Sequence, residues 1–237
     1  MDLSQVTCVA MDAPLPQDLP RLLIAVLLAK SGAAATPHGL PLFGLDDGLF
    51  LQHSDHPGLM TKREVRVQLL ADLHLPEHGV LWDIGAGTGS VGLEALRLRP
   101  QLRLLAVERR GGGAALIQAN AERLGVRPAL TLEIHARHLA DADLPEDLSH
   151  PDRVILGGGG QDRGELLRFV LAQLKPNGVV VIPLATIEAV AECRPLMEAA
   201  GLTVDITQLQ AWRGAPLADG TRLTPMNPSM ILKGHAR

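Results

Sequence analysis

The sequence contains no tyrosine and few other aromatic residues, with two tryptophans and three phenylalanines among 237 residues. Proteins that hold single-stranded nucleic acid stack its bases on exposed aromatic rings, so this scarcity argues against such a platform. The formal net charge of −4 and a pI near 6.1 also give no overall attraction for a polyanion. We therefore expect no nucleic-acid partner, and a core built mainly from Leu, Val, Ile and Ala.

Cysteines and long apolar runs are also scarce. Cys8 and Cys193 are far apart and have neither metal-site spacing nor the pattern of a disulfide framework, which is consistent with a reducing cytosol. The longest apolar run, residues 22–29, is far shorter than the roughly 20 residues that span a bilayer. Asp2 lies where a signal peptide would carry basic residues. We expect a cytoplasmic protein without a membrane partner.

Nine histidines are the remaining source of metal ligands. Three pairs have a spacing of three or four residues, but neither cysteines nor clustered acidic residues accompany them. We predict no metal site. The pairs are His53 and His56, His74 and His78, and His135 and His138.

The first 58 residues differ from the rest of the chain. Residues 31–60 are rich in Gly, Pro, His and Asp and show no sustained periodicity. A short strand at 6–11 and a helix at 19–30 are predicted before them. We predict an N-terminal appendage over residues 1–58 and a principal domain over residues 59–237.

The principal domain alternates strands and helices. Its first helix should begin at Thr61, because Thr61 and Glu64 have the spacing of a capping box. Short apolar strands between helices predict an α/β fold with a doubly wound, mostly parallel sheet. The last two strands have no helix between them, so the last strand should be antiparallel, as in the Rossmann-like fold of S-adenosylmethionine-dependent methyltransferases. The seven strands are predicted at 80–84, 103–107, 129–134, 153–156, 179–183, 203–209 and 229–233, with a connection without a helix at 210–228.

The stretch LWDIGAGTGSVGLEA at residues 81–95 is a glycine-rich turn between a strand and a helix. Glycines let the backbone approach a ligand closely, and the start of the helix offers free N–H groups. Counted from Gly87, the glycines fit the dinucleotide fingerprint. Counted from Gly85, they fit the GxGxG loop of S-adenosylmethionine-dependent methyltransferases. A strand that ends at residue 84 makes Gly85 the first glycine, which favours the second reading.

Two acidic residues complete this pattern. Asp83 precedes the first glycine by two positions, where methyltransferases commonly have a carboxylate that braces the loop and dehydrogenases normally have an apolar residue. Glu108 follows the second strand, where a carboxylate can accept both hydroxyls of an adenosine ribose. Glu108 fits either cofactor, so the register and Asp83 indicate S-adenosylmethionine.

Several motifs, taken together and in this order, resemble one family. They are MTKREVR at 60–66, GGGG at 157–160 and NP at 227–228. Over residues 44–233 the sequence resembles the decarboxylating precorrin methyltransferases of cobalamin biosynthesis. Residues 6–21 faintly resemble the end of the methyltransferase domain that precedes this one in the fused enzymes. The resemblance implies methylation of carbon 15 of a precorrin-6 type macrocycle, with decarboxylation of the ring C acetate.

The resemblance also implies roles for individual residues. Arginines suit the many carboxylates of a precorrin, whereas no general-base pair is evident, so no catalytic residue is predicted. Contacts to the cofactor are expected from Thr61, Asp83, Gly85, Ala86, Gly87, Gly89, Glu108, Arg109, Ala136 and Gly157. Contacts to the macrocycle are expected from Gly158, Gly159, Arg213 and Arg222.

The resemblance further implies a homo-oligomer, a tetramer, that acts on a tetrapyrrole. Whether a separate methyltransferase or a fused domain methylates carbon 5 stays open at the level of sequence. Three alternatives stay open at the level of sequence. One is a methyltransferase of the same fold that acts on protein or tRNA, and another is a non-catalytic, cofactor-binding partner subunit. The third is a dehydrogenase.

Overall fold

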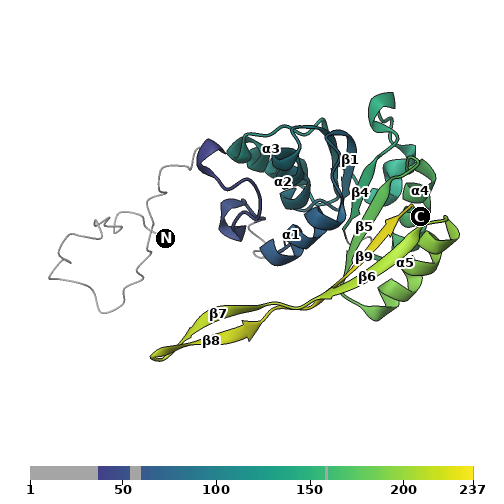
Figure 1. The fold of residues 1–237 in the computed structure, drawn as a ribbon. Helices are drawn as coiled ribbons and strands as arrows, with labels where there is room; N and C mark the ends of the chain where they lie inside the picture. Colours follow the sequence, from purple (N-terminus) through teal and green to yellow (C-terminus); the bar gives the residue numbers. More distant parts are fainter. Residues whose placement is uncertain (1–36, 54–59, 158–159, 237) are drawn as a thin grey trace, which may run out of the picture. The chain divides into compact units, whose positions relative to one another are not determined.

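The computed structural model describes residues 37–53, 60–157 and 160–236, and its central feature is a seven-stranded sheet (Figure 1). The strand order is β3-β2-β1-β4-β5-β9-β6. The pairs from β3 to β5 are parallel, whereas β9 lies antiparallel between β5 and β6. The predicted fold class and the antiparallel last strand are confirmed. The strands are β1 (His78–Ile84), β2 (Gln101–Glu108), β3 (Leu130–Glu133), β4 (Arg153–Leu156), β5 (Val179–Leu184), β6 (Thr203–Leu209) and β9 (Ser229–His235).

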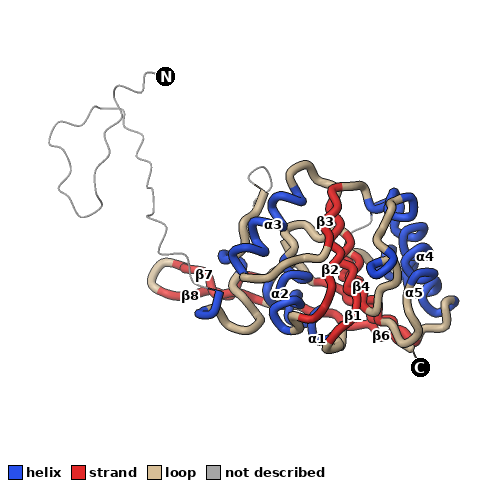
Figure 2. The backbone as a smooth tube through the Cα atoms, turned by 90° about the horizontal axis from the view of Figure 1, so that it is seen from above, coloured by secondary structure: helices blue, strands red, loops and turns tan. Residues whose placement is uncertain are grey.

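Helices cover both faces of the sheet (Figures 1 and 2). Successive strand residues point to opposite faces. Leu81 therefore joins the core under the first three helices, and Trp82 joins the core under the last two. Because both faces are buried, the central strands consist mainly of apolar residues, and this made them recognisable in the sequence. The first core lies under α1 (Arg63–Asp72), α2 (Ser90–Leu98) and α3 (Gly113–Leu124), and the second under α4 (Arg163–Gln173) and α5 (Ile187–Ala199).

The carboxyl ends of β1, β2 and β4 meet at one edge of the sheet. Ile84, the last residue of β1, is paired with Val107 of β2 on one side and Leu156 of β4 on the other. The chain continues from β1 to β2 on one side and returns to β4 on the other. In open α/β sheets, ligands bind outside the carboxyl ends of the strands at such a switch point.

The connection between β6 and β9 is a β-hairpin of β7 (Trp212–Leu217) and β8 (Gly220–Pro225), whereas the sequence had predicted no strand there. Leu217 pairs with Gly220 across a two-residue turn that contains Ala218 at a φ of 46°. The strands are almost wholly exposed. They lack the alternation of a half-buried strand, so periodicity could not reveal them. The Asp219-Gly220 pair is the turn signal that the sequence did carry.

The predicted capping box at Thr61 is wrong. Helix α1 begins at Arg63, and its preceding residue makes no side-chain capping bond. The Asp47 carboxylate accepts the Arg63 N–H at 2.9 Å instead, from sixteen residues upstream. An acceptor from a distant segment therefore performs the capping that local spacing suggested. The seven strands predicted for the principal domain are all found, with ends that match or differ by one or two residues.

Residues 37–53 pack on the helices of the first core. Leu45 and Phe50 are buried within that core. The Arg97 guanidinium of α2 donates to the carbonyls of Pro37 and Pro41. The predicted boundary at residue 58 stays a prediction, and the strand and helix expected at 6–11 and 19–30, like Cys8, lie outside the described residues.

Candidate functional site: the glycine-rich loop at the switch point

The turn after β1 contains three glycines in the left-handed region. Gly85, Gly87 and Gly89 have φ angles of 76°, 59° and 76°, which side chains with a Cβ rarely adopt. A Cβ on Gly85 would lie 2.1 Å from the carbonyl oxygen of Gly157. A Cβ on Gly87 would meet nothing within 4 Å, so this part of the loop borders open space. The strand ends at Ile84, as the GxGxG register requires.

The loop is fixed between the two neighbouring strands. The N–H groups of Gly85 and Ala86 donate to the Val107 carbonyl at 2.8 and 3.0 Å. On the other side, the Gly157 N–H donates to the Ile84 carbonyl at 2.7 Å. Gly157 therefore lies directly beside the loop, and its expected contact with the cofactor stays a prediction. Gly158 and Gly159 lie outside the described residues.

Asp83 is almost completely buried and points its carboxylate at the start of α2. Its Oδ2 accepts the Gly92 N–H at 3.0 Å. Burial raises the pKa of Asp83 to about 7; the Gly92 hydrogen bond opposes this shift and the charge of Glu108 adds to it. A Cβ on Gly92 would lie 2.9 Å from both Asp83 and Leu104. Gly92, which created the apparent dinucleotide match, is therefore explained by packing of the helix against the sheet.

Glu108 bridges the glycine loop and the turn after β2. Its two carboxylate oxygens accept the N–H of Gly87 at 2.7 Å and the N–H of Arg110 at 2.9 Å. A carboxylate has about four acceptor positions, so these bonds leave capacity for a ligand hydroxyl. A Cβ on Gly113 would lie 2.6 Å from the Glu108 Cγ, so the start of α3 must be glycine to accommodate this side chain. The predicted ribose contact fits this arrangement and stays a prediction.

Several donors of the loop have no acceptor within the described residues. They are the Thr88 hydroxyl, which is buried, and the backbone N–H groups of Thr88, Ser90 and Val91. Orphan N–H groups at a helix start form a favourable site for an anionic group. The loop therefore fits a ligand with a carboxylate, such as the methionine end of S-adenosylmethionine.

A buried ion pair holds residues 44–47 beside this site. Arg66 and Glu94 are both fully buried, and the Arg66 Nε donates to the Glu94 Oε2 at 2.7 Å. The other Glu94 oxygen accepts the N–H groups of Gly44 and Leu45. This pair was not predicted from the sequence. Its available signal was Arg66 itself, a charged residue at an apolar position of α1, in register with Leu69, Leu70 and Leu73.

Thr61 precedes α1 and is half-buried. The Arg66 Nη1 donates to its carbonyl oxygen at 2.7 Å, so the buried pair also fixes the backbone of the predicted TK segment. The side chain of Thr61 makes no capping bond. Its predicted place over the methionine part of the cofactor stays a prediction.

The two arginines predicted to bind the macrocycle differ in their surroundings. Arg213 of β7 makes a bidentate pair with Glu64, at 2.9 and 2.6 Å, and also contacts Asp47 at 2.8 Å. The hydrogen bond with Arg213 holds the pKa of Glu64 below its usual value. Arg213 therefore anchors the hairpin to α1 and residue 47. Arg222 is exposed on β8 opposite Ala215 and has no ion pair within the described residues.

The remaining predicted cofactor residues lie at the ends of β2 and β3. Arg109 follows β2 and is exposed, and Ala136 begins a 3-10 helix after β3. Glu108 and Glu133 are register partners, so these two segments are adjacent. The His135 Nε2 lies 4.0 Å from the Asp162 Oδ2 beyond β4. This His–Asp approach could not be inferred from the sequence, where the residues are 27 positions apart.

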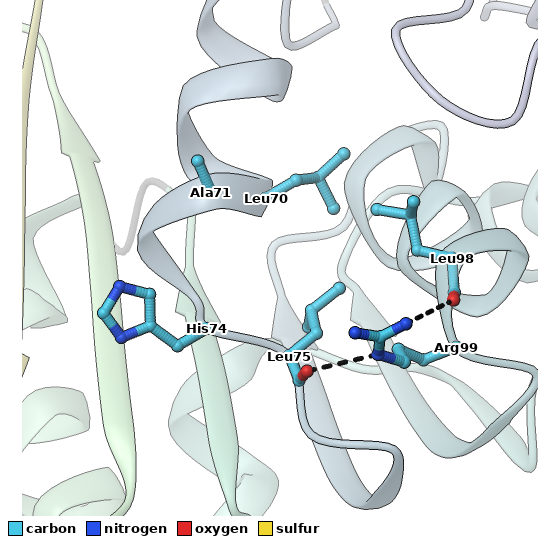
Figure 3. Close-up of a pocket in the computed structure, with 6 residues that line it drawn as sticks. All are labelled: Leu70, Ala71, His74, Leu75, Leu98 and Arg99. Carbon is cyan, nitrogen blue, oxygen red and sulfur yellow. Dashed lines mark hydrogen bonds between the residues drawn. The ribbon is translucent and has the colours of Figure 1, made fainter.

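A separate hollow of about 440 Å³ lies at the opposite ends of α1 and α2. Figure 3 shows the Arg99 guanidinium turned toward the carbonyls of Leu75 and Leu98, at 3.3 and 3.4 Å. The hollow contains none of the predicted site residues. Within the described ranges, no group of His, Cys, Asp and Glu is arranged to hold a metal ion. No helix there is long and apolar enough to cross a membrane.

The sheet order, the antiparallel β9 and the glycine-rich loop after β1 define the class of protein: it has the Rossmann-like fold of S-adenosylmethionine-dependent methyltransferases. A family model described as the precorrin methyltransferase domain matches residues 52–234. The chain belongs to this family, and the resemblance found in the sequence is confirmed.

Individual relatives agree with this assignment. A probable cobalt-precorrin-6B C(15)-methyltransferase (decarboxylating) from Pyrobaculum calidifontis is 31% identical over 201 residues, which cover 84% of this chain and 98% of the relative. A precorrin-6Y C(5,15)-methyltransferase [decarboxylating] from Sinorhizobium sp. is 34% identical over 190 residues, 80% of this chain and 43% of that protein. The crystal structure of precorrin-6Y C5,15-methyltransferase from Geobacter metallireducens has a TM-score of 0.73 and 30% identity, covering 83% of this chain and 98% of that one.

Proposed function

We propose that this protein is a decarboxylating precorrin methyltransferase of cobalamin biosynthesis, which methylates carbon 15 of a precorrin-6 type macrocycle and removes the ring C acetate carboxylate as carbon dioxide. The observation that carries the proposal is the loop of Gly85, Gly87 and Gly89, held at the switch point of a fold whose family acts on precorrins. Methylation of carbon 5 belongs, on this proposal, to a separate protein.

The loop supports S-adenosylmethionine as the cofactor. The open N–H groups of Thr88, Ser90 and Val91 suit its carboxylate, and Glu108 suits its ribose hydroxyls. On this proposal, Arg109 and Ala136, at the ends of β2 and β3, contact the adenine. When bound, S-adenosylmethionine supplies an electrophilic methyl group on its sulfonium.

The chemistry balances without a strong base from the protein. Cleavage of the bond between the ring C acetate methylene and its carboxylate releases carbon dioxide and leaves the electron pair in the conjugated macrocycle. Carbon 15 forms the new bond to the methyl carbon, and the electrons of the broken carbon–sulfur bond stay on sulfur. One negative and one positive charge disappear together. The chain then has to position the two reactants and exclude water. Gly157 and the glycine loop allow this because their backbone can lie close to both reactants.

Mass spectrometry of a single reaction mixture tests the proposal. The protein is incubated with S-adenosylmethionine and a precorrin-6 macrocycle, and the product should gain one methyl group and lose carbon dioxide. Cofactor binding without any change in macrocycle mass would contradict the enzymatic assignment and favour a non-catalytic partner. Methylation of tRNA or protein in place of the macrocycle would also overturn the substrate assignment.

The ribose assignment has its own test. Glu108→Ala should weaken S-adenosylmethionine binding by about tenfold or more, because a charge-assisted hydrogen bond and the brace on Gly87 are both lost. Isothermal titration calorimetry measures the change. Glu122→Ala, which removes an exposed carboxylate from α3, is the matched control and should bind like the unaltered protein. Equal affinities of the two variants would show that Glu108 does not hold the ribose.

We also propose a homo-oligomer, a tetramer by family resemblance. The hairpin of β7 and β8 supports this, since it forms a two-stranded sheet of its own. Trp212, Leu217 and Leu223 expose 54%, 56% and 71% of their surface on it. An isolated hairpin is marginally stable in water, and exposed apolar side chains on it favour a covering partner. A second copy of the chain is the proposed partner.

A further inference from the structure

Asn120 of α3 is fully buried and uses its side-chain amide to join two separate segments. Its Oδ1 accepts the Leu51 N–H at 2.7 Å, and its Nδ2 donates to the Leu51 carbonyl at 3.0 Å. The same Nδ2 donates to the Thr88 carbonyl at 2.9 Å. One amide therefore holds both backbone groups of Leu51 and one backbone group of the glycine-rich loop.

The bond to Thr88 fixes the peptide unit between Thr88 and Gly89. The carbonyl of that unit is held by Asn120, and its N–H donates to the Ala86 carbonyl at 2.8 Å. With both ends bonded, this peptide cannot rotate freely. Its orientation sets the directions of the neighbouring open N–H groups, on Thr88 before it and Ser90 after it.

The backbone of Leu51 is likewise fixed at both of its polar groups by Asn120. It lies just beyond Phe50, which is buried in the core and contacts the Arg66 guanidinium, 4.8 Å from its ring centroid. Two residues farther on, the Nε2 of His53 is buried and has no hydrogen-bond partner among the described residues. Asn120 thus links the loop to a segment that follows residues 44 and 45, which Glu94 of the buried pair holds.

We infer that Asn120 is a positioning residue for the cofactor: it holds the glycine-rich loop in the binding conformation and ties Leu51 to it. The inference rests on the proposed cofactor site. A purely structural asparagine would affect stability alone, whereas a positioning residue also affects the affinity of the loop for its ligand.

The test uses Asn120→Asp in the full chain. Aspartate has the same shape, but its second oxygen would face the carbonyls of Leu51 and Thr88 and cannot donate to them. The dissociation constant for S-adenosylmethionine should rise by about tenfold or more. Hydrogen exchange, measured without the cofactor, should become faster in the peptides that contain residues 49–53 and 85–91.

The matched control is Leu124→Ala, which removes a buried side chain from the same helix without touching the loop. It should lower the melting temperature and leave both the affinity and the exchange of the loop unchanged. Asn120→Ser, which keeps one donor, serves if the aspartate variant does not fold, and should show an intermediate loss of affinity.

Three outcomes separate the possibilities. Weaker binding with faster loop exchange, absent from Leu124→Ala, supports the inference. Unchanged affinity and unchanged exchange in a folded Asn120 variant overturn it. If the unaltered protein itself does not bind S-adenosylmethionine, the proposed function fails, and the exchange measurement alone still decides whether Asn120 holds the loop.

Discussion

At the scale of the residue, Asp83 combines deep burial with a carboxylate that titrates near neutrality. Its pKa rises from 3.8 to about 7 because burial disfavours the charged form. Between these two pH values the unfolded chain releases this proton while the folded chain retains it, so the contribution of Asp83 to stability falls as the pH rises. Above pH 7 both states are ionised and the contribution is constant. The total loss is on the order of 4 kcal/mol.

Asp83→Asn removes this pH dependence, because an amide does not ionise and its oxygen can still accept the Gly92 N–H. Urea unfolding of both proteins at pH 5 and pH 8 measures the effect. The difference in unfolding free energy, variant minus unaltered protein, should become more positive at pH 8. A difference that is the same at both pH values would contradict the raised pKa.

At the scale of the element, the fully buried Arg66–Glu94 pair joins α1 to α2 and secures residues 44 and 45. Arg66→Met leaves Glu94 buried without its counter-charge and should cost about 3–5 kcal/mol of unfolding free energy, measured by urea denaturation. The double variant Arg66→Met, Glu94→Leu removes both charges and should recover part of that loss. A double variant less stable than the single one would show that the hydrogen bonds of Glu94 to Gly44 and Leu45 matter more than the unpaired charge.

At the scale of the whole molecule, we predict that the exposed hairpin of β7 and β8 mediates the assembly of several copies of the chain. Leu217→Ser with Leu223→Ser removes apolar surface from β7 and β8 and leaves the seven-stranded sheet unchanged. The double variant should have a smaller mass in light scattering than the unaltered protein, while its circular dichroism stays the same. Ile187→Ser, which removes an equally exposed apolar side chain from α5, is the control and should keep the assembly intact. An unchanged mass in the hairpin variant would place the subunit contact elsewhere.

The parts of the site that the sequence predicted are those with a local cause. Gly85, Gly87 and Gly89 follow a buried strand directly, and the apolar length of that strand decides which glycine comes first. Asp83 could be placed because its distance from the turn is two residues. Each of these inferences depends on spacing within one strand–turn–helix unit, and such spacing can be read directly from the sequence.

Contacts between distant segments could not be predicted in the same way. Asp47 caps α1 across sixteen residues, Asn120 holds Leu51 across 69, and Arg213 reaches Glu64 across 149. The fold brings two carboxylates of its own chain to Arg213, which the sequence did not indicate, and the expected contact of Arg213 with the macrocycle stays a prediction. The sequence alone thus determined the fold class and the register of the glycine loop, because burial periodicity and turn chemistry are local, and its motifs indicated the family by resemblance. The tertiary structure decided which polar groups pair, because hydrogen-bond partners are chosen by proximity in space once the sheet has formed.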